Sequence, residues 1–154
     1  MALTEISLSQ EDGLICQIFT RTHIVTADDP PPDSEDDEGP TPLELFLASL
    51  GSSSAVALRI EAERLGIDVE EVQISVKWRT SHRRLLDPGE VLPSTAIQRE
   101  IRVRVTRDIS EAERDSLLEA AKTSPVSRVL GDVRVEDALY VMGYADPDSG
   151  VVAE

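Results

Sequence analysis

The sequence predicts a single α+β domain in which strands wrap around helices. Three patterns lead to this fold class: a long apolar helix in mid-chain, alternating strand patterns on both sides of it, and a second, amphipathic helix further on. Two hairpin-like sets of strands, each followed by a helix, are typical of this class. The chain has 154 residues, a length typical of one domain, so we expect residues 1–154 to fold as one unit.

The central helix is predicted for residues 42–65. Thr41 is a hydroxyl N-cap, Pro42 suits the first helical position, and Glu44 lies where a capping box has its acid. Gly66 follows the helix, where a left-handed residue commonly ends one. A helix of this length spans about 36 Å, whereas a chain of this size has a radius of gyration of about 15 Å. The helix is therefore expected to cross the whole domain.

Apolar residues occupy every face of the first turns of this helix. They are Leu43, Leu45, Phe46, Leu47, Leu50, Ala55, Val56, Ala57 and Leu58. A helix that is apolar all round must be covered all round, and we expect a second copy of the chain to supply part of that cover. The small residues 51–54 allow close approach of another segment. Among them, Ser53 lies on an apolar stripe with Val56 and Ile60.

A membrane span is the rival interpretation of this helix. However, the apolar run is shorter than the roughly 20 residues that a bilayer core requires, and it contains Glu44 and several serines. The formal net charge of −15 also argues against binding to nucleic acid or to anionic membrane surfaces. The N-terminus has neither a basic nor an apolar signal region, which predicts a cytoplasmic protein. No cofactor is predicted.

Two strands are predicted before the helix, at residues 4–10 and 14–25, joined by a turn at residues 11–13. Cys16 is the only cysteine, so neither an intrachain disulfide nor a cysteine-based metal site is expected. Residues 28–40 contain seven carboxylates and four prolines. Their spacing fits no calcium loop, and we interpret the segment as a mobile linker that buries nothing.

Alternation after the helix predicts strands at residues 72–79 and 101–106, then at 133–135 and 139–144. Between these pairs, Ser110 opens a capping box for a helix that ends near Lys122. Ser124 is the N-cap of a short helix that ends at Gly131. Residues 81–95 are rich in turn-forming residues and contain the only basic cluster, His82-Arg83-Arg84.

The serines of residues 51–54 do not form a nucleophile elbow, which requires a strand-to-helix turn. The two histidines, His23 and His82, have no spacing that places either beside Ser53. A serine hydrolase is therefore disfavoured.

Residues 39–76, which read GPTPLELFLASLGSSSAVALRIEAERLGIDVEEVQISV, resemble the central segment of the OsmC/Ohr superfamily. In that family, a peroxidatic cysteine follows the second proline by eleven residues, a position that Ser53 occupies here. The family's second cysteine begins a Cys-Pro-Val motif, which here is Ser124-Pro125-Val126. The resemblance implies antiparallel sheets wrapped around two long central helices, in an intertwined homodimer with active sites at the subunit interface.

The resemblance also implies a thiol-dependent peroxidase that acts on organic hydroperoxides during oxidative stress. Both cysteine positions are serine, however, and Leu43 stands where the organic-hydroperoxide branch has a glutamate. That branch also has an arginine near the first hairpin, where this chain has residues 10–12, Gln-Glu-Asp. Glu44 matches a glutamate of the wider family, although its role as a helix cap also explains it.

A serine hydroxyl cannot replace a thiolate in this chemistry, because it lacks the acidity and the sulfenic acid cycle of cysteine. We therefore expect a peroxidase scaffold with Ser53 at the peroxidatic position and Ser124 at the resolving position, inactive in hydroperoxide reduction. Either natural loss or deliberate replacement of the cysteines fits the sequence. The alternative is a non-catalytic binding module that holds a small hydrophobic ligand at the dimer interface.

Overall fold

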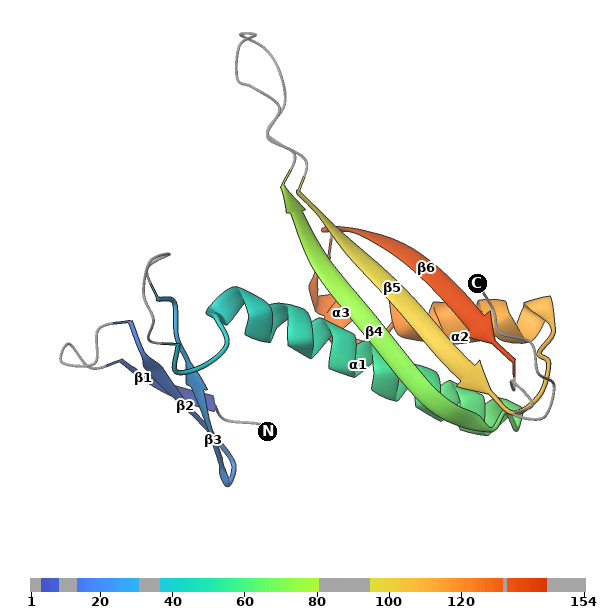
Figure 1. Ribbon diagram of the computed structural model, residues 1–154, viewed down its shortest axis with the longest axis horizontal. Helices are drawn as coiled ribbons and strands as arrows, with labels where there is room; N and C mark the ends of the chain where they lie inside the picture. Colours follow the sequence, from blue (N-terminus) through green and yellow to red (C-terminus); the bar gives the residue numbers. More distant parts are fainter. Residues whose placement is uncertain (1–3, 9–13, 31–36, 81–94, 132, 144–154) are drawn as a thin grey trace, which may run out of the picture. The chain divides into compact units, whose positions relative to one another are not determined.

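The computed structural model describes residues 4–8, 14–30, 37–80, 95–131 and 133–143. Its elements follow the order β-β-β-α-β-β-α-α-β (Figure 1). The chain divides into two compact units, Met1–Ala48 and Ser49–Glu154. The predicted turn at residues 11–13 and the basic cluster that contains His82 lie outside the described residues.

The N-terminal unit contains an antiparallel sheet of β1 (Thr4–Leu8), β2 (Cys16–Thr20) and β3 (His23–Ala27). The predicted single strand over residues 14–25 is wrong, because the chain turns at residues 21–22 and pairs Thr20 with His23. Arg21 adopts a left-handed conformation with φ 54° in this turn. Such turns usually contain glycine or asparagine, and the absence of either residue here concealed the hairpin.

The acidic segment after β3 is anchored at both described ends. Asp28 is only 5% exposed, and its carboxylate accepts a hydrogen bond from the backbone N–H of Glu38 at 3.2 Å. Its own N–H donates to the carbonyl of Pro40 at 3.2 Å. Gly39 fits beside β3 only because it lacks a Cβ, which would lie 2.6 Å from the carbonyl oxygen of Thr26. The prediction that residues 28–40 bury nothing is therefore wrong at Asp28, while residues 31–36 lie outside the described part.

Helix α1 (Pro42–Leu65) has the predicted bounds. At its start, the N–H of Thr41 donates to Glu44 Oε2 at 2.8 Å, and the N–H of Glu44 donates to Thr41 Oγ1 at 3.2 Å. At its end, Gly66 has φ 66°, and the N–H of Ile67 donates to the carbonyl of Ala62 at 2.9 Å. The contacts at the start are the predicted capping box, and those at the end form a Schellman motif around the left-handed Gly66 that the sequence predicted.

The C-terminal unit contains a sheet in the order β4 (Val69–Thr80), β5 (Thr95–Val105), β6 (Arg134–Met142). Strands β4 and β5 are antiparallel, whereas β6 runs parallel to β5. The two strands predicted at 133–135 and 139–144 are in fact one, and its parallel pairing with β5 departs from the antiparallel sheets that the resemblance implied. Residues 136–137, Glu-Asp, resemble a break in the strand pattern, but Asp137 pairs with Arg99 of β5 in the register.

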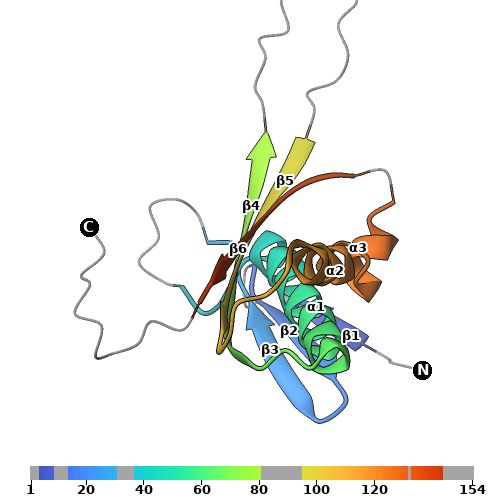
Figure 2. The same ribbon diagram turned by 90° about the vertical axis from the view of Figure 1, so that its right-hand side faces the viewer.

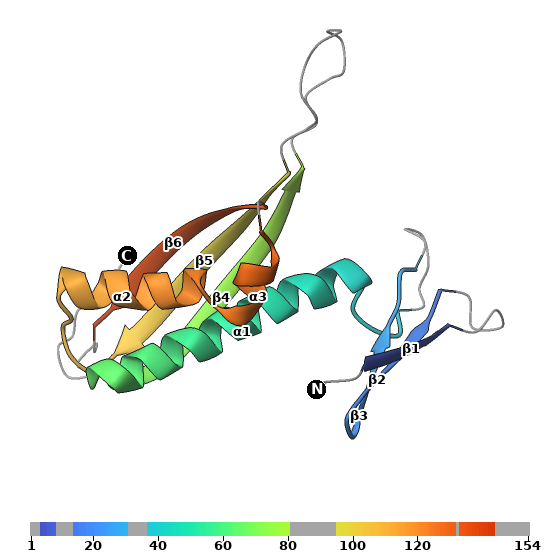
Figure 3. The ribbon, with the colours of Figure 1, turned by 180° about the vertical axis from the view of Figure 1, so that it is seen from behind.

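Helices α2 (Glu111–Lys122) and α3 (Pro125–Val129) lie with α1 on one face of this sheet (Figures 2 and 3). Their caps, Ser110 and Ser124, are as predicted. The core between helices and sheet is aliphatic. Its buried members are Leu58, Ala62, Ile67, Val69, Ile101, Val103, Val105, Leu117, Ala121 and Leu139. Gly51 allows close contact with β4, because a Cβ there would lie 3.3 Å from Val76 Cγ2.

Within the described residues, α1 is the one helix with the length and apolar composition to cross a bilayer. This is weak evidence for a membrane span, because the core helices of soluble proteins meet the same criteria. Within the C-terminal unit, α1 has a buried face that includes Leu50, Ser54 and Leu58.

The cap of α2 predicts a pH-dependent contribution to stability. The hydrogen bond from Arg107, followed by those from Ser110, lowers the pKa of Glu113 from 4.5 to about 2. An acid with a lowered folded-state pKa stabilises the fold above its unfolded pKa, and that contribution is lost as the pH falls through about 2. We expect Glu113→Gln, which retains a capping side chain, to be less stable than the parent at pH 7.

The stability difference between Glu113→Gln and the parent should disappear between pH 4.5 and about 2. Chemical denaturation at a series of pH values measures it. A difference that stays constant over this range would show that the charge of Glu113 does not stabilise the cap.

Candidate functional site

A groove lies along α1 where α3 packs beside it. The groove has a volume of about 450 Å³ and is lined by Ser49, Ser52, Ser53, Val56, Ala57, Ile60, Pro125 and Val126; we call it the Ser53 groove. Its aliphatic side chains are open to solvent in the single chain, with Val56 60% and Ile60 62% exposed. No charged residue lines it among the described residues. The groove therefore favours uncharged, apolar molecules.

Ser53 connects the two sides of the groove. It lies on α1 and is half-buried, and its Oγ accepts a hydrogen bond from the backbone N–H of Val126 at 3.3 Å. Val126 belongs to the Ser124-Pro125-Val126 motif at the start of α3. The structure thus brings together two motifs that are separated by about 70 residues in the sequence.

Ser124 is more deeply buried than Ser53, with 1% of its surface exposed. Its Oγ lies 2.8 Å from Ser127 Oγ and accepts a hydrogen bond from the N–H of Ser127 at 3.4 Å. This is the capping geometry that the Ser-Pro pair predicted. Ser127 Oγ in turn donates a hydrogen bond to the carbonyl of Ala121, at the end of α2, at 3.3 Å.

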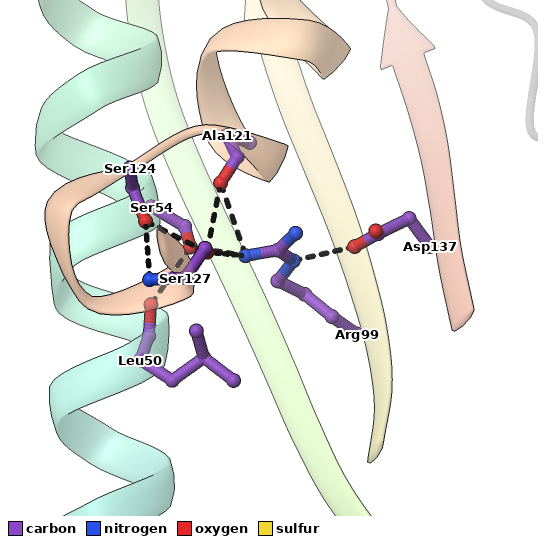
Figure 4. Close-up of polar contacts among 7 residues, drawn as sticks. All are labelled: Leu50, Ser54, Arg99, Ala121, Ser124, Ser127 and Asp137. Carbon is purple, nitrogen blue, oxygen red and sulfur yellow. Dashed lines mark hydrogen bonds and ion pairs between the residues drawn. The ribbon is translucent and has the colours of Figure 1, made fainter. Parts of the chain in front are cut away.

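A buried arginine lies beneath this junction (Figure 4). Arg99 of β5 is 2% exposed, and its Nη1 donates to Ser54 Oγ at 2.5 Å, to Ser127 Oγ at 2.9 Å and to the carbonyl of Ala121 at 3.1 Å. Its Nε donates to Asp137 Oδ1 at 2.5 Å in an ion pair that is nearly closed to solvent. Ser54 Oγ in turn donates a hydrogen bond to the carbonyl of Leu50 at 2.7 Å.

Sequence reasoning missed this cluster, although a signal for it exists. Ile97, Arg99 and Ile101 alternate with Gln98 and Glu100, so Arg99 is in phase with the buried side chains. A cation at an inward position of a strand requires a buried partner. Asp137 supplies that partner.

Glu44, the third residue predicted for the site, belongs to the N-terminal unit. Its carboxylate accepts hydrogen bonds from Thr41, which lower the pKa of Glu44 below its usual value. The structure therefore supports the capping role of Glu44.

Cys16 is half-buried on β2, with its sulfur 3.9 Å from the carbonyl of Leu14. His23 is at the exposed start of β3. Among the described residues, no three histidines, cysteines or acids gather in a way that could hold a metal ion.

The family model described as OsmC-like protein matches residues 34–136, well over half of the chain and including both the Ser53 and the Ser124 motifs. The chain belongs to the OsmC-like protein family. The family predicted from the sequence is thus confirmed. No curated protein matches the chain.

Solved structures of the family share the fold. An OsmC-like protein from Mycoplasma pneumoniae superposes with a TM-score of 0.71 at 16% identity, over 94% of this chain and 98% of that one. An organic hydroperoxide resistance protein OsmC from Legionella pneumophila gives a TM-score of 0.58 at 17% identity, with 92% and 96% covered. OhrB of Bacillus subtilis, also named for organic hydroperoxide resistance, gives 0.58 at 20% identity, with 91% and 98% covered. These likenesses confirm the predicted α+β, OsmC-like fold class.

Proposed function

We propose that this OsmC-like protein retains the scaffold of a thiol-dependent peroxidase of the oxidative stress response but does not reduce hydroperoxides. The observation that carries the proposal is that Ser53 and the Ser124 motif meet at one groove, through the hydrogen bond from Val126 to Ser53 Oγ. These are the two positions at which the resemblance places the redox cysteines. This meeting of the two positions supports a peroxidase scaffold that lacks its sulfur atoms.

Oxygen cannot perform this chemistry in place of sulfur. Reduction of a hydroperoxide requires a thiolate that attacks the O–O bond and becomes a sulfenic acid, which a second thiol resolves. A serine hydroxyl stays protonated at neutral pH and forms no comparable intermediate. The remaining thiol, Cys16, lies on β2 in the N-terminal unit. Assay of the parent chain with cumene hydroperoxide and a dithiol tests this proposal, and turnover above the uncatalysed rate would contradict it.

We further propose that the chain forms a homodimer. Two apolar surfaces of the single chain support this. Val56 and Ile60 are more than half exposed on α1, and Ile6 and Leu8 are more than half exposed on one face of β1. A monomer seldom leaves several large aliphatic side chains this open in contiguous groups. A second copy of the chain is the occupant that fits, because both surfaces are aliphatic. The proposed location is the cytoplasm. The net charge of −15 disfavours nucleic acid and anionic membranes as partners, because it repels both.

A second candidate function is the binding of a small hydrophobic ligand in the Ser53 groove at the dimer interface. The uncharged, largely aliphatic lining of the groove favours it. We expect the neutral fluorophore N-phenyl-1-naphthylamine to bind the parent chain with increased fluorescence. Ala57→Phe, which fills the groove, should weaken this binding by at least about tenfold.

Ala112→Phe provides a matched control, because it adds the same ring to an exposed position of α2. It should leave the affinity for the fluorophore unchanged. Absence of binding to the parent, or equal binding to both variants, would remove the ligand-binding function. It would leave the proposed absence of peroxidase activity in place.

A further inference from the structure

Four elements meet at Arg99. Its guanidinium contacts α1 through Ser54, the end of α2 through the carbonyl of Ala121, and α3 through Ser127, while Asp137 on β6 holds its other side. The close-up shows these groups converging on one side chain (Figure 4). Both members of the ion pair are nearly closed to solvent. Every hydrogen bond that Nη1 donates therefore forms where water does not compete for the donor.

Stability alone does not account for a charge at this place. Ile97 and Ile101, its inward neighbours on β5, are fully buried. Removal of an arginine and an aspartate from water is costly, and a well-packed apolar pair of similar size is often as stable or more stable. What an apolar pair cannot do is specify which groups on three helices lie next to one another. A planar guanidinium with several fixed N–H directions can do so.

The residues to which Arg99 donates hydrogen bonds are neighbours of residues that line the Ser53 groove. Ser54 neighbours Ser53 on α1, and Ser127 fixes the first turn of α3, whose Pro125 and Val126 line the groove. The contact across the groove is the 3.3 Å hydrogen bond from Val126 to Ser53 Oγ. A small shift of α3 along α1 would break this bond and change the width of the groove.

We propose that Arg99, aimed by Asp137, is the positioning residue of the Ser53 groove: it sets the place of α3 against α1 and thereby the fit of an apolar ligand. This inference rests on the proposed role of the groove. Arg99 acts through Ser54 and Ser127 and does not itself line the groove.

The test compares the parent with the double variant Arg99→Met, Asp137→Leu, which replaces the ion pair with apolar residues of similar size. Amide hydrogen exchange, measured residue by residue by NMR, reports local opening. We expect exchange at Val126 and Ser127 to accelerate by at least about tenfold, which corresponds to one lost hydrogen bond. Amides of the core strand, such as Val103, should keep their protection. Binding of N-phenyl-1-naphthylamine should weaken to a similar extent.

Two single variants sharpen the result. Arg99→Lys keeps the charge but loses the planar fork, so it should restore part of the protection at Val126. Arg102→Met is the matched control, since Arg102 is on the outer face of the same strand and pairs with the exposed Glu100. It should change nothing at Val126. Unchanged exchange at Val126 in a folded Arg99→Met, Asp137→Leu variant would overturn the proposal, as would equal acceleration at every core amide.

If the Arg99→Met, Asp137→Leu variant does not fold, a smaller change still tests the proposal. Ser127→Ala removes only the hydroxyl through which Arg99 contacts α3, and unchanged exchange at Val126 in this variant would equally overturn the proposal. The exchange measurement needs no ligand. If the parent binds no fluorophore while exchange at Val126 still depends on Arg99, the ligand-binding function fails and the positioning role of Arg99 stands.

Discussion

The double variant Ser53→Cys, Ser124→Cys is expected to reduce cumene hydroperoxide with a dithiol as reductant, at a rate at least about tenfold above the background of the parent chain. The groove gives the hydroperoxide an apolar approach to position 53. The N–H of Val126, which now donates to Ser53 Oγ, can donate to a thiolate there and stabilise its charge. Cysteine is close in size to serine and more apolar, so both positions should accept it.

The expected reaction has three steps. The thiolate at position 53 attacks the O–O bond, which releases the alkoxide, protonated to cumyl alcohol, and leaves a sulfenic acid. The thiol at position 124 then attacks that sulfur, which forms a disulfide and expels water. The dithiol reductant restores both thiols by disulfide exchange. The rate is expected to remain modest, because two side chains of the organic-hydroperoxide branch are missing. Leu43 replaces its glutamate, and residues 10–12 contain no arginine.

Two variants serve as controls for this gain of activity. Ser53→Cys alone should be oxidised once and then stall as a sulfenic acid that dimedone traps, because position 124 then offers no resolving thiol. Ser52→Cys with Ser124→Cys moves the first sulfur to the neighbouring, exposed serine and should not turn over. If the Ser53→Cys, Ser124→Cys variant folds but shows neither trapping nor turnover, the groove is not a peroxidase site, and the ligand-binding function becomes the better account.

Light scattering of the parent at micromolar concentration should give twice the 16.8 kDa mass of one chain, and Val56→Asp combined with Ile60→Asp should abolish this dimer. Burial of each valine or isoleucine contributes about 1.5–3 kcal/mol. A symmetric interface loses each contribution twice, and buried carboxylates add a desolvation cost. The dissociation constant of the dimer is therefore expected to rise by at least about a thousandfold.

Thr106→Asp is the control for added charge, because Thr106 is exposed and immediately follows β5. It should remain dimeric. A folded parent that scatters as a monomer would contradict the proposed dimer. A Val56→Asp, Ile60→Asp variant that stays dimeric would place the interface elsewhere on the chain.

Local signals determined much of the fold. The caps at Thr41, Ser110 and Ser124 and the left-handed Gly66 fixed the bounds of the helices, because these residues satisfy backbone groups within a few positions of themselves. The alternation on β4 and β5 likewise reflects which side chains face the core. The motifs at positions 53 and 124 could be assigned to a family before any geometry was known, and the family model confirms that family.

Only the tertiary structure decided what depends on contacts between distant segments. Nothing local marks the turn at Arg21, and nothing local shows that Asp28 is buried against the returning backbone of Glu38. The parallel pairing of β6 with β5 places Asp137 opposite Arg99, 38 residues away. Asp137, which resembled a break in the strand pattern, is therefore the buried partner of Arg99. The Ser53 groove itself exists only where α3 packs on α1, because its two sides lie far apart in the sequence and are joined by side-chain geometry that no local pattern specifies.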